Sequence, residues 1–356
     1  MNIAKGRIKG EFVSGINGNY LVTVSSKGKR NRLSTIDNDG ADFGPDTPGT
    51  TSSGINEAIN ASQTGNVVLL DGRFRTRSKI EVKEGVNLSG NQRSVIVNDT
   101  EDPFEPVLWF KPYSSSSFLT IDANGQSGIK IGDMGNNDIE INRIKVYNTG
   151  NMVIDNERTQ IAVEINGFNN VIHSIDIFQG NVGIKIAQSS DLRIVDLQVV
   201  NCSSGIVMSS SEHVNIEHFS VDSCSHVGLQ IDSTNDLYAK GIVWNNTSAY
   251  PSNKLINGIL LGNYSSDNPN NLITINAKLF NTGGTGIKLA NTSLCNLFLD
   301  IANTRLNTKG NEIRVGIEYS GGLSLINTMI QMDKVNNAIA GTVSGKLKIN
   351  GNDFEP

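Results

Sequence analysis

Apolar and polar positions alternate in short stretches along most of the chain, and the stretches recur in the same order. Residues 182–231 contain two copies of one arrangement: a Gly-apolar-x-apolar segment, a polar corner, and a second alternating segment. Alternation with a period of two is typical of β-strands that are buried on one face, and not of helices. We therefore expect the side chains of Ile194, Leu197 and Val199 to point into a core.

The Gly-apolar-x-apolar motif recurs at nearly regular intervals. From a degenerate copy at Gln160, successive copies begin 23, 22, 23, 30, 28, 30 and 25 residues apart. Such periods are typical of solenoids, in which no unit buries its apolar face alone and stacking provides the core. The fold class predicted is all-β, a parallel β-helix of coils of about 22–30 residues. The motif begins at Gly128, Gly183, Gly205, Gly228, Gly258, Gly286 and Gly316, and a last copy begins at Gly341.

A polar residue precedes seven of these motifs. It lies four or five positions before the motif at Gln179, Asn201, Ser223 and Asn281, and twelve or thirteen positions before it at Asn148, Asn246 and Asn303. Residues of this kind tolerate left-handed turn conformations. We expect them to stack as an Asn-type ladder inside the turn. Cys202 and Cys224 occupy equivalent positions in neighbouring coils, where a disulfide and two buried thiols are both compatible with the geometry. No redox context is evident, so two buried thiols are favoured.

The first part of the chain has a different pattern. Ile55, Ala58 and Ile59 have helical spacing after Ser53, which predicts a short capping helix with Ser53 as its N-cap. Asn17-Gly18 between alternating residues predicts a β-hairpin. We divide the chain into an N-terminal attachment segment (1–33), β-helix entry and cap (34–110), coils (111–345) and a C-terminal tail (346–356). Residues 26–32 are interpreted as a solvated basic linker.

Composition and charge restrict the classes of partner. The net charge of −5 argues against nucleic-acid binding, for which a basic stripe is usual. The sequence has no run of 18 apolar residues, so no membrane span is expected. No apolar signal-peptide region is evident near the start. Three cysteines do not suggest a disulfide scaffold, and no cofactor is predicted.

Residues 34–90 resemble the entry segment of the pectate-lyase-like superfamily. The matching residues are Asp39 to Asp42, Val67 to Gly72 and Gly85 to Gly90, with departures at Asp71, where Pro is usual, and Phe74, where Tyr is usual. With the coils, the resemblance covers roughly residues 34–345 and implies a right-handed parallel β-helix. The superfamily includes lyases, hydrolases, epimerases and phage tail proteins, so the resemblance leaves the activity open.

An N-terminal extension followed by a β-helix is most similar to bacteriophage tail spikes and appendages. This resemblance implies a homotrimer in the virion, extracellular on release, attached to other tail proteins through the N-terminus. It also implies recognition, with or without hydrolysis, of a host capsule, exopolysaccharide or teichoic acid. The alternatives are a non-enzymatic structural or receptor-binding tail protein, and a cellular polysaccharide lyase or hydrolase.

Outward positions of the coils gather the residue types that saccharide sites use. We name this set the polar stripe; its members are Arg143, His173, Asp176, Arg193, Asp196, Glu217, His218, Tyr238 and Lys240. Asp176 and Asp196 lie one coil apart and two residues offset, which places their Cα atoms roughly 8 Å apart. Inverting glycosidases hold their two carboxyl groups at about 6.5–9.5 Å. Asp176 and Asp196 are therefore candidate acid and base, with Glu217 as a replacement for either, and a purely solvated surface is the alternative.

Substrate contacts are expected from Arg193, His218, Tyr238 and Lys240 in the polar stripe. A second candidate cleft is the loop at 244–257, where Trp244 and Tyr250 either stack on sugar rings or pack on the coil. His213, His218 and His226 fall in different columns, so a zinc site is not predicted.

Overall fold

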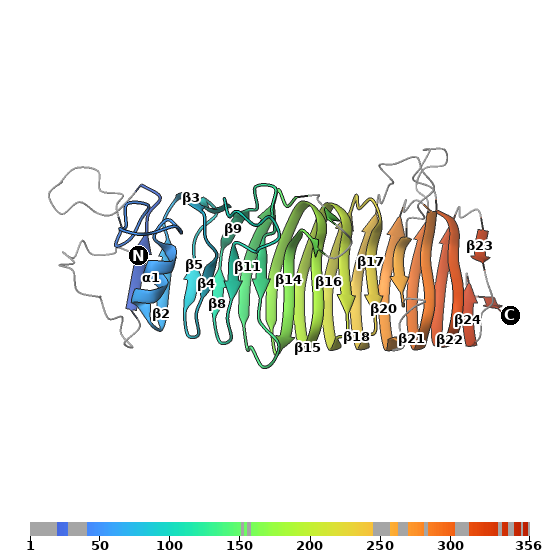
Figure 1. The fold of residues 1–356 in the computed structure, drawn as a ribbon. Helices are drawn as coiled ribbons and strands as arrows, with labels where there is room; N and C mark the ends of the chain where they lie inside the picture. Colours follow the sequence, from blue (N-terminus) through green and yellow to red (C-terminus); the bar gives the residue numbers. More distant parts are fainter. Residues whose placement is uncertain are drawn as a thin grey trace, which may run out of the picture.

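The computed structural model describes residues 20–27, 41–150, 153–154, 158–244, 257–262, 270–280, 284–302, 313–333, 337–340, 345–349 and 352–354. These residues form an elongated stack of coils, with the N-terminal helix at one end and the last strands at the other (Figure 1). The predicted parallel β-solenoid is confirmed. One continuous sheet contains 23 of the described strands, and β12 and β13 form a separate antiparallel pair.

The first coils use short strands, interrupted by loops. The helix is α1 (Ile55–Ser62). The strands are β1 (Tyr20–Val24), β2 (Gly65–Leu69), β3 (Gly72–Thr76), β4 (Ile80–Val82), β5 (Asn87–Ser89), β6 (Ser94–Asn98), β7 (Leu108–Phe110), β8 (Ser115–Ser117), β9 (Leu119–Asp122), β10 (Ile129–Ile131), β11 (Glu140–Tyr147), β12 (Val153–Ile154) and β13 (Arg158–Thr159).

The later coils are more regular, and some strands continue through the corners. These strands are β14 (Ile161–Phe168), β15 (Val171–Ser209), β16 (Glu212–Asp222), β17 (Val227–Asp232), β18 (Asn235–Trp244), β19 (Asn257–Leu261), β20 (Asn270–Phe280), β21 (Gly284–Ala302), β22 (Ile313–Asp333), β23 (Asn337–Ala340), β24 (Gly345–Ile349) and β25 (Asn352–Phe354).

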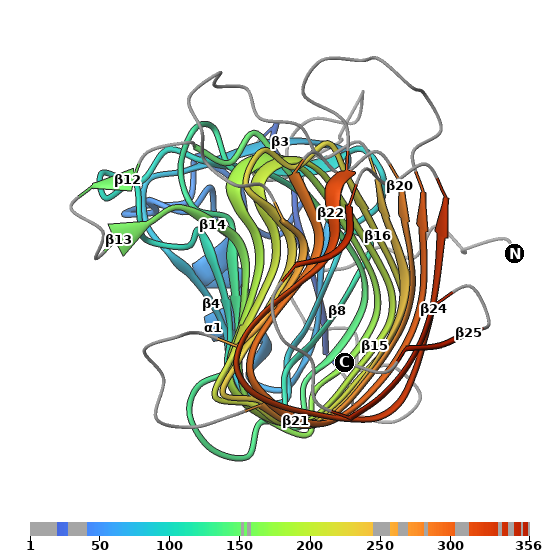
Figure 2. The ribbon, with the colours of Figure 1, turned by 90° about the vertical axis from the view of Figure 1, so that its right-hand side faces the viewer.

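Equivalent residues of successive coils lie in register. Leu192 pairs with Val214, which pairs with Leu237, and the column continues to Ile273. Seen along the axis, the strands follow one another around a common interior (Figure 2). Ile194, Leu197 and Val199 are fully buried in it, as the alternation predicts.

The repeated glycine of each coil has a steric cause. A Cβ atom at Gly183 would lie 2.4 Å from Cγ1 of Val199, and one at Gly205 would lie 2.4 Å from the carbonyl oxygen of Gly228. Backbone oxygens of the next coil cannot move away without breaking the parallel ladder. Close stacking of the coils therefore requires glycine at these two positions.

The polar turn residues adopt the predicted backbone conformation, but their side chains do not lie inside the turn. Asn148, Gln179, Asn201 and Ser223 have φ angles of 56°, 65°, 57° and 57°. The first three side chains are exposed and that of Ser223 is half-buried, so the expected internal ladder is wrong for these coils. The left-handed residue directs its polar group outward, and the inner positions next to it belong to buried Cys202 and Cys224.

All three cysteines are free and buried, which confirms the preference for two thiols at Cys202 and Cys224. Burial raises the pKa of each thiol, to about 12 for Cys224 and Cys295. Turn positions Asn246, Asn281 and Asn303 lie outside the described residues.

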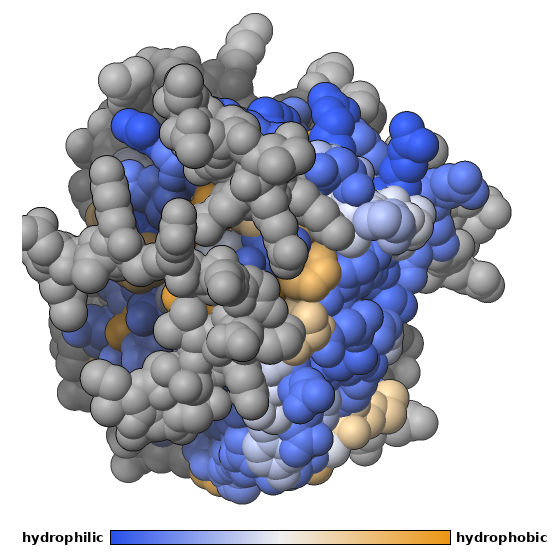
Figure 3. Space-filling view, turned by 90° about the vertical axis from the view of Figure 1, so that its left-hand side faces the viewer, coloured by the Kyte–Doolittle hydropathy of each residue, from blue (hydrophilic) through white to orange (hydrophobic). Residues whose placement is uncertain are grey.

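The capping helix forms where expected, with a different first turn. Ile55, Ala58 and Ile59 are buried against the first coils, so the apolar face of α1 is confirmed. Ser53 is not the N-cap: that position is Gly54, with a φ of 83°, and the Ser53 hydroxyl donates to the carbonyl oxygen of Arg75. The hydroxyl oxygen of Ser52 accepts from the backbone N–H of Asn56 at 3.0 Å. From this end, the described side chains in view are mostly hydrophilic (Figure 3).

The N-terminal segment enters the sheet. β1 pairs in parallel with β2, from Tyr20 opposite Gly65 to Val24 opposite Leu69. The Asn17-Gly18 turn and residues 28–32 of the basic linker lie outside the described residues. In the part of the chain that the structure covers, no helix has the length and apolar character needed to span a membrane.

Candidate functional site

The polar stripe follows the outer surface of β11, β15, β16 and β18. The registers place Arg193 beside Asn215 and Asn215 beside Tyr238, each on the next coil. All nine members lie on the outside of the solenoid, either exposed or half-buried. The stripe extends over more than one column of the coils, because Arg143 lies beside Ser174 whereas Asp176 lies beside Lys145. A binding or catalytic role of these residues stays a prediction.

Basic and acidic side chains within the stripe pair across neighbouring coils. The Arg193 Nε atom lies 2.6 Å from Oε1 of Glu217, and the His218 Nδ1 atom lies 3.0 Å from Oδ1 of Asp196. On the preceding coils, Arg143 lies 3.6 Å from Asp176. Each candidate carboxylate thus has its own basic partner. The His173 ring makes a similar contact with Glu140, outside the set.

Asp176 and Asp196 lie on consecutive coils. The Arg193 N–H donates to the Asn170 carbonyl oxygen at 3.0 Å, which sets the register of the two coils and puts Asp196 two residues out of step with Asp176. Their surroundings differ: the Asp176 side chain is 17% exposed and that of Asp196 is 54% exposed. The two candidate carboxylates therefore differ in their access to solvent.

Two exposed aromatic residues, Tyr238 and Trp244, lie on the outer side of β18. Tyr238 is 42% exposed and Trp244 is 39% exposed, with exposed Lys240 between them. Trp244 lies beside Asp222 on one neighbouring coil and Phe280 on the other. Tyr250 and the rest of the loop, 245–256, lie outside the described residues.

The histidines do not converge. His213 lies at a corner between Asp191 and Asp236, with ring nitrogens 3.7 and 3.8 Å from their carboxylates, whereas His218 faces Asp196. No cluster of three or more potential metal ligands occurs among the residues that the structure describes.

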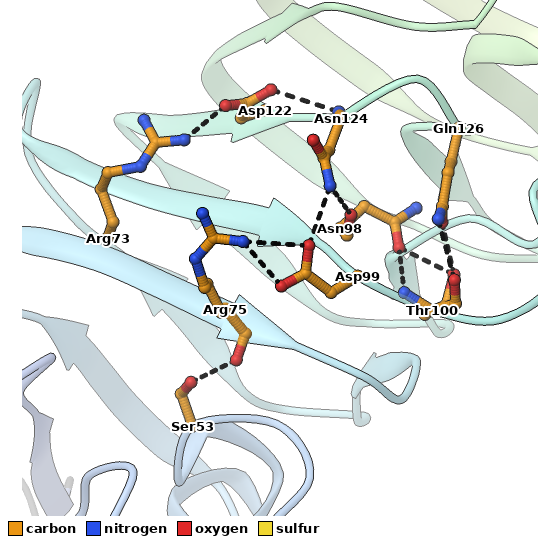
Figure 4. A network of polar contacts seen from close by, with 9 residues as sticks. All are labelled: Ser53, Arg73, Arg75, Asn98, Asp99, Thr100, Asp122, Asn124 and Gln126. Carbon is orange, nitrogen blue, oxygen red and sulfur yellow. Dashed lines mark hydrogen bonds and ion pairs between the residues drawn. The ribbon is translucent and has the colours of Figure 1, made fainter.

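A polar network on the first coils was not found by sequence reasoning (Figure 4). Arg73 on β3 donates to Asp122 on β9, with Nη2 2.5 Å from Oδ2, and Asn148 donates to the other carboxylate oxygen at 3.1 Å. Burial alone raises the pKa of Asp122, but these hydrogen bonds and one from the Asn124 backbone hold it below 3.8. The hydrogen bond to Asp122, followed by one to the Tyr147 hydroxyl, raises the pKa of Arg73.

The network continues through Arg75, which donates to both oxygens of Asp99, while Asn124 donates to Asp99 and to the carbonyl oxygen of Asn98. Its members come from three successive coils. We interpret the network as structural, because its central carboxylate is covered and already has a full set of donors. No short motif in the sequence indicates it, since Arg73 and Asp122 are 49 positions apart.

A pocket of about 360 Å³ opens at the corner of the solenoid that follows β14. It is separated from the polar stripe by the turn residues Asp191, His213 and Asp236, whose φ angles are positive. Sequence reasoning did not find it, although an apolar residue in a polar turn, Phe168, is a signal that was available. The residues that line it are Met134, Gly135, Phe168, Gln188, Ser189, Ser190, Ser210, Ser211, Glu212 and Asn235.

No family model and no curated protein matches the chain. Solved structures do match. The Dettilon tailspike protein has 16% identity and a TM-score of 0.62 over 87% of this chain and 67% of that one. A hyperthermoactive exopolygalacturonase from Thermotoga maritima has 14% identity and a TM-score of 0.55, over 85% of this chain and 88% of the enzyme. PfbA, a surface adhesin of Streptococcus pneumoniae, has 14% identity and a TM-score of 0.53, over 83% and 85%.

At these identities the likeness establishes the fold and leaves the activity open. The three neighbours include a tailspike, an adhesin and an enzyme. The chain therefore has the fold of the pectate-lyase-like right-handed parallel β-helix proteins, among which are phage tailspike proteins.

Proposed function

We propose that this protein recognises a bacterial surface polysaccharide, which binds along the polar stripe. The observation that carries this proposal is the outer side of β18, where Tyr238, Lys240 and Trp244 are exposed. Tyr238 shares a column with Asn215 and Arg193 of the two preceding coils, and Arg193 forms an ion pair with Glu217. An aromatic ring offers an apolar face to a sugar ring. The paired side chains next to it offer donors and acceptors to hydroxyl groups.

The regular stacking of the coils favours an extended ligand. Neighbouring coils are about 4.8 Å apart, so the stripe presents its polar groups at a constant interval along the solenoid axis. A polymer with a short repeat can make the same kind of contact on each coil. A small isolated ligand gains nothing from this repetition.

A role in a phage tail is the biological setting that we propose. The likeness to a tailspike protein supports it. In this setting the chain assembles as a homotrimer, its N-terminal segment contacts other tail proteins, and it meets the host outside the cell. Capsule, exopolysaccharide and teichoic acid are the host polymers to test.

Hydrolysis is a second candidate function, favoured by the placement of Asp176 and Asp196 on consecutive coils. The two-residue offset places the Cα atoms roughly 8 Å apart, and inverting enzymes hold their two carboxyl groups at about 6.5–9.5 Å. In such a mechanism one of the two carboxyl groups would protonate the leaving oxygen and the other would activate the water. Glu217 would replace either group if one proves dispensable.

The first experiment measures binding of the full chain to a panel of bacterial surface polysaccharides, with Tyr238→Ala beside Tyr113→Ala. Tyr113 is 50% exposed on an early coil and serves as the matched control. We expect only Tyr238→Ala to weaken binding, by about tenfold. Absence of binding to every polymer, or equal losses in both variants, would contradict recognition along the stripe.

Hydrolysis is tested in the same samples by the release of reducing ends, with Asp176→Asn and Asp196→Asn. Loss of release in both variants, with binding retained, supports the acid and base assignment. If both variants still release reducing ends, the protein is a hydrolase whose catalytic residues lie elsewhere. Binding without release from any polymer leaves a recognition protein.

A further inference from the structure

The pocket at the corner after β14 has a mixed lining that the polar stripe lacks. Its wall is built from one column of adjacent coils, in which Phe168 pairs with Ser190, Ser190 with Glu212, and Glu212 with Asn235. The loop that carries Met134 closes one side, where the Phe168 N–H donates to the carbonyl oxygen of Gly135 at 2.8 Å.

The apolar part of the lining is exposed to solvent. Phe168 is 42% exposed and Met134 is 77% exposed. Large apolar side chains at the edge of a concave site gain free energy when a ligand covers them. These two side chains therefore favour a ligand with an apolar face.

Several polar side chains of the pocket make no hydrogen bond to other described residues. Among the residues that the structure describes, the side chains of Gln188, Ser210, Glu212 and Asn235 have no hydrogen-bond or ion-pair partner within the chain. Ser189 and Ser211 differ, because their hydroxyl groups donate to the backbone carbonyl oxygens of Ile165 and Ser209. The back wall is thus fixed by the fold, and the free donors and acceptors are available to a ligand. Ser190 donates to Asp191.

The charged side chain that lines the pocket is acidic. The lining includes Glu212 and no lysine or arginine. The acidic corner residues Asp191 and Asp236 lie on either side of His213, which directly follows Glu212. A carboxylate or phosphate group of a ligand would face like charge here without a paired cation.

We infer that this corner pocket is a subsite for an uncharged sugar residue, a neutral hexose or an N-acetylhexosamine, with its apolar face on Phe168 and its hydroxyl groups toward Gln188, Ser210 and Asn235. This inference rests on the proposed function and narrows its substrate class. The volume of 360 Å³ is near the lower end of ligand pockets, roughly 300–1,000 Å³, so it suits a short branch or one residue of a chain. Uronate-rich and phosphate-linked polymers are excluded from this subsite.

The test uses the full chain with methionine methyl groups labelled with ¹³C, and Met134→Leu assigns the Met134 signal. The probes are methyl glucoside, methyl N-acetylglucosaminide and methyl glucuronide. We expect the two neutral glycosides to shift the Met134 signal, with an affinity about tenfold lower in Phe168→Ala. Phe298→Ala, with the same exposed fraction of 42%, is the control and leaves the affinity unchanged. In Glu212→Gln we expect a smaller difference in affinity between methyl glucoside and methyl glucuronide, because the like charge that opposes the glucuronide is gone. Glu101→Gln removes an exposed carboxylate elsewhere and is the control, in which this difference in affinity stays the same.

Two results of the Met134 titration would overturn the subsite. The first is an unchanged Met134 signal with both neutral glycosides, and the second is glucuronide binding as tightly as glucoside. Polysaccharide binding that persists equally in Phe168→Ala would remove the pocket and leave the proposed function standing. A shift of the Met134 signal in a protein that binds no polysaccharide would contradict the proposed function and leave the pocket as a site for small sugars.

Discussion

The Asp122 carboxylate lies against the Arg73 guanidinium, with Oδ2 2.5 Å from Nη2, although the two residues come from different coils. The Asp122 side chain is 9% exposed and that of Arg73 is 52% exposed. The Asn148 amide approaches the same carboxylate from the turn after β11. This one acidic group therefore joins β3, β9 and the coil that follows.

Replacement of Asp122 by Asn is expected to destabilise the protein by about 1–3 kcal/mol, because it removes the negative charge and keeps only one acceptor oxygen. The new amide NH2 then faces a donor group of either Arg73 or Asn148. The control is Asp99→Asn, since Asp99 and Arg75 are more exposed, at 24% and 67%. Its cost is expected to stay below about 1 kcal/mol. Urea unfolding followed by circular dichroism measures both, and equal costs would refute the special role of Asp122.

The acid stability of the protein is expected to depend on the same carboxylate. The pKa of Asp122 in the folded state lies below its value of 3.8 in the unfolded chain. As pH falls, the unfolded state takes up the proton first, so the stabilisation is complete above 3.8 and is lost through the folded-state pKa. Unfolding midpoints measured from pH 5 to pH 2 are expected to fall more steeply for the natural chain than for Asp122→Asn. Parallel curves would contradict this linkage.

The coils could be predicted from the sequence because each coil contains its own alternation of apolar and polar residues. Ile194, Leu197 and Val199 alternate with polar residues, and burial follows directly from that period. The outward positions of Asp176 and Asp196 follow from the same period. The orientation of a side chain at a turn was harder to predict than its backbone conformation. The positive φ angle of Asn201 follows from its residue type. The outward direction of its amide depends on its neighbour, because Cys202 occupies the inner position.

The contacts that sequence reasoning missed are those without a local signal. Arg73 and Asp122 meet because two strands with one coil between them lie in register, which no short motif encodes. The corner pocket likewise depends on how the loop that carries Met134 folds over Phe168. The prediction of Ser53 as the N-cap was wrong because its hydroxyl group donates to the carbonyl oxygen of Arg75. Arg75 lies outside the stretch of sequence around the helix on which the prediction was based.

Alanine at Gly205 is expected to destabilise the solenoid by about 1–3 kcal/mol. The new Cβ would lie 2.4 Å from the Gly228 carbonyl oxygen and 2.6 Å from Cγ1 of Val221, and the backbone atom cannot move without disturbing the next coil. Ser203→Ala, two positions earlier on a half-buried side chain, is the control and is expected to be near neutral. Thermal unfolding compares the two, and a Gly205→Ala protein as stable as the control would mean that the coils can separate locally.

The three thiols are expected to resist alkylation in the folded protein. They are buried, and burial raises the pKa of Cys224 and Cys295 to about 12, so almost no reactive thiolate exists near neutral pH. Iodoacetamide at pH 8, followed by intact mass measurement, is expected to add no group to the folded chain and three after denaturation. Rapid modification of the native protein would show that a coil opens locally or that a thiol is accessible.

Substitutions in the polar stripe are expected to leave stability almost unchanged, which makes binding assays on them interpretable. His218 and Asp196 are 60% and 54% exposed, and exposed ion pairs contribute about 0–1 kcal/mol. His218→Ala should therefore shift the free energy of unfolding by less than about 1 kcal/mol. Asp122→Asn serves as the destabilised reference in the same urea titration. A loss as large as that of Asp122→Asn would mean that the stripe holds the coils together, and a loss of glycan binding in His218→Ala would then report unfolding. An unchanged midpoint with weakened binding would assign the Asp196–His218 pair to recognition.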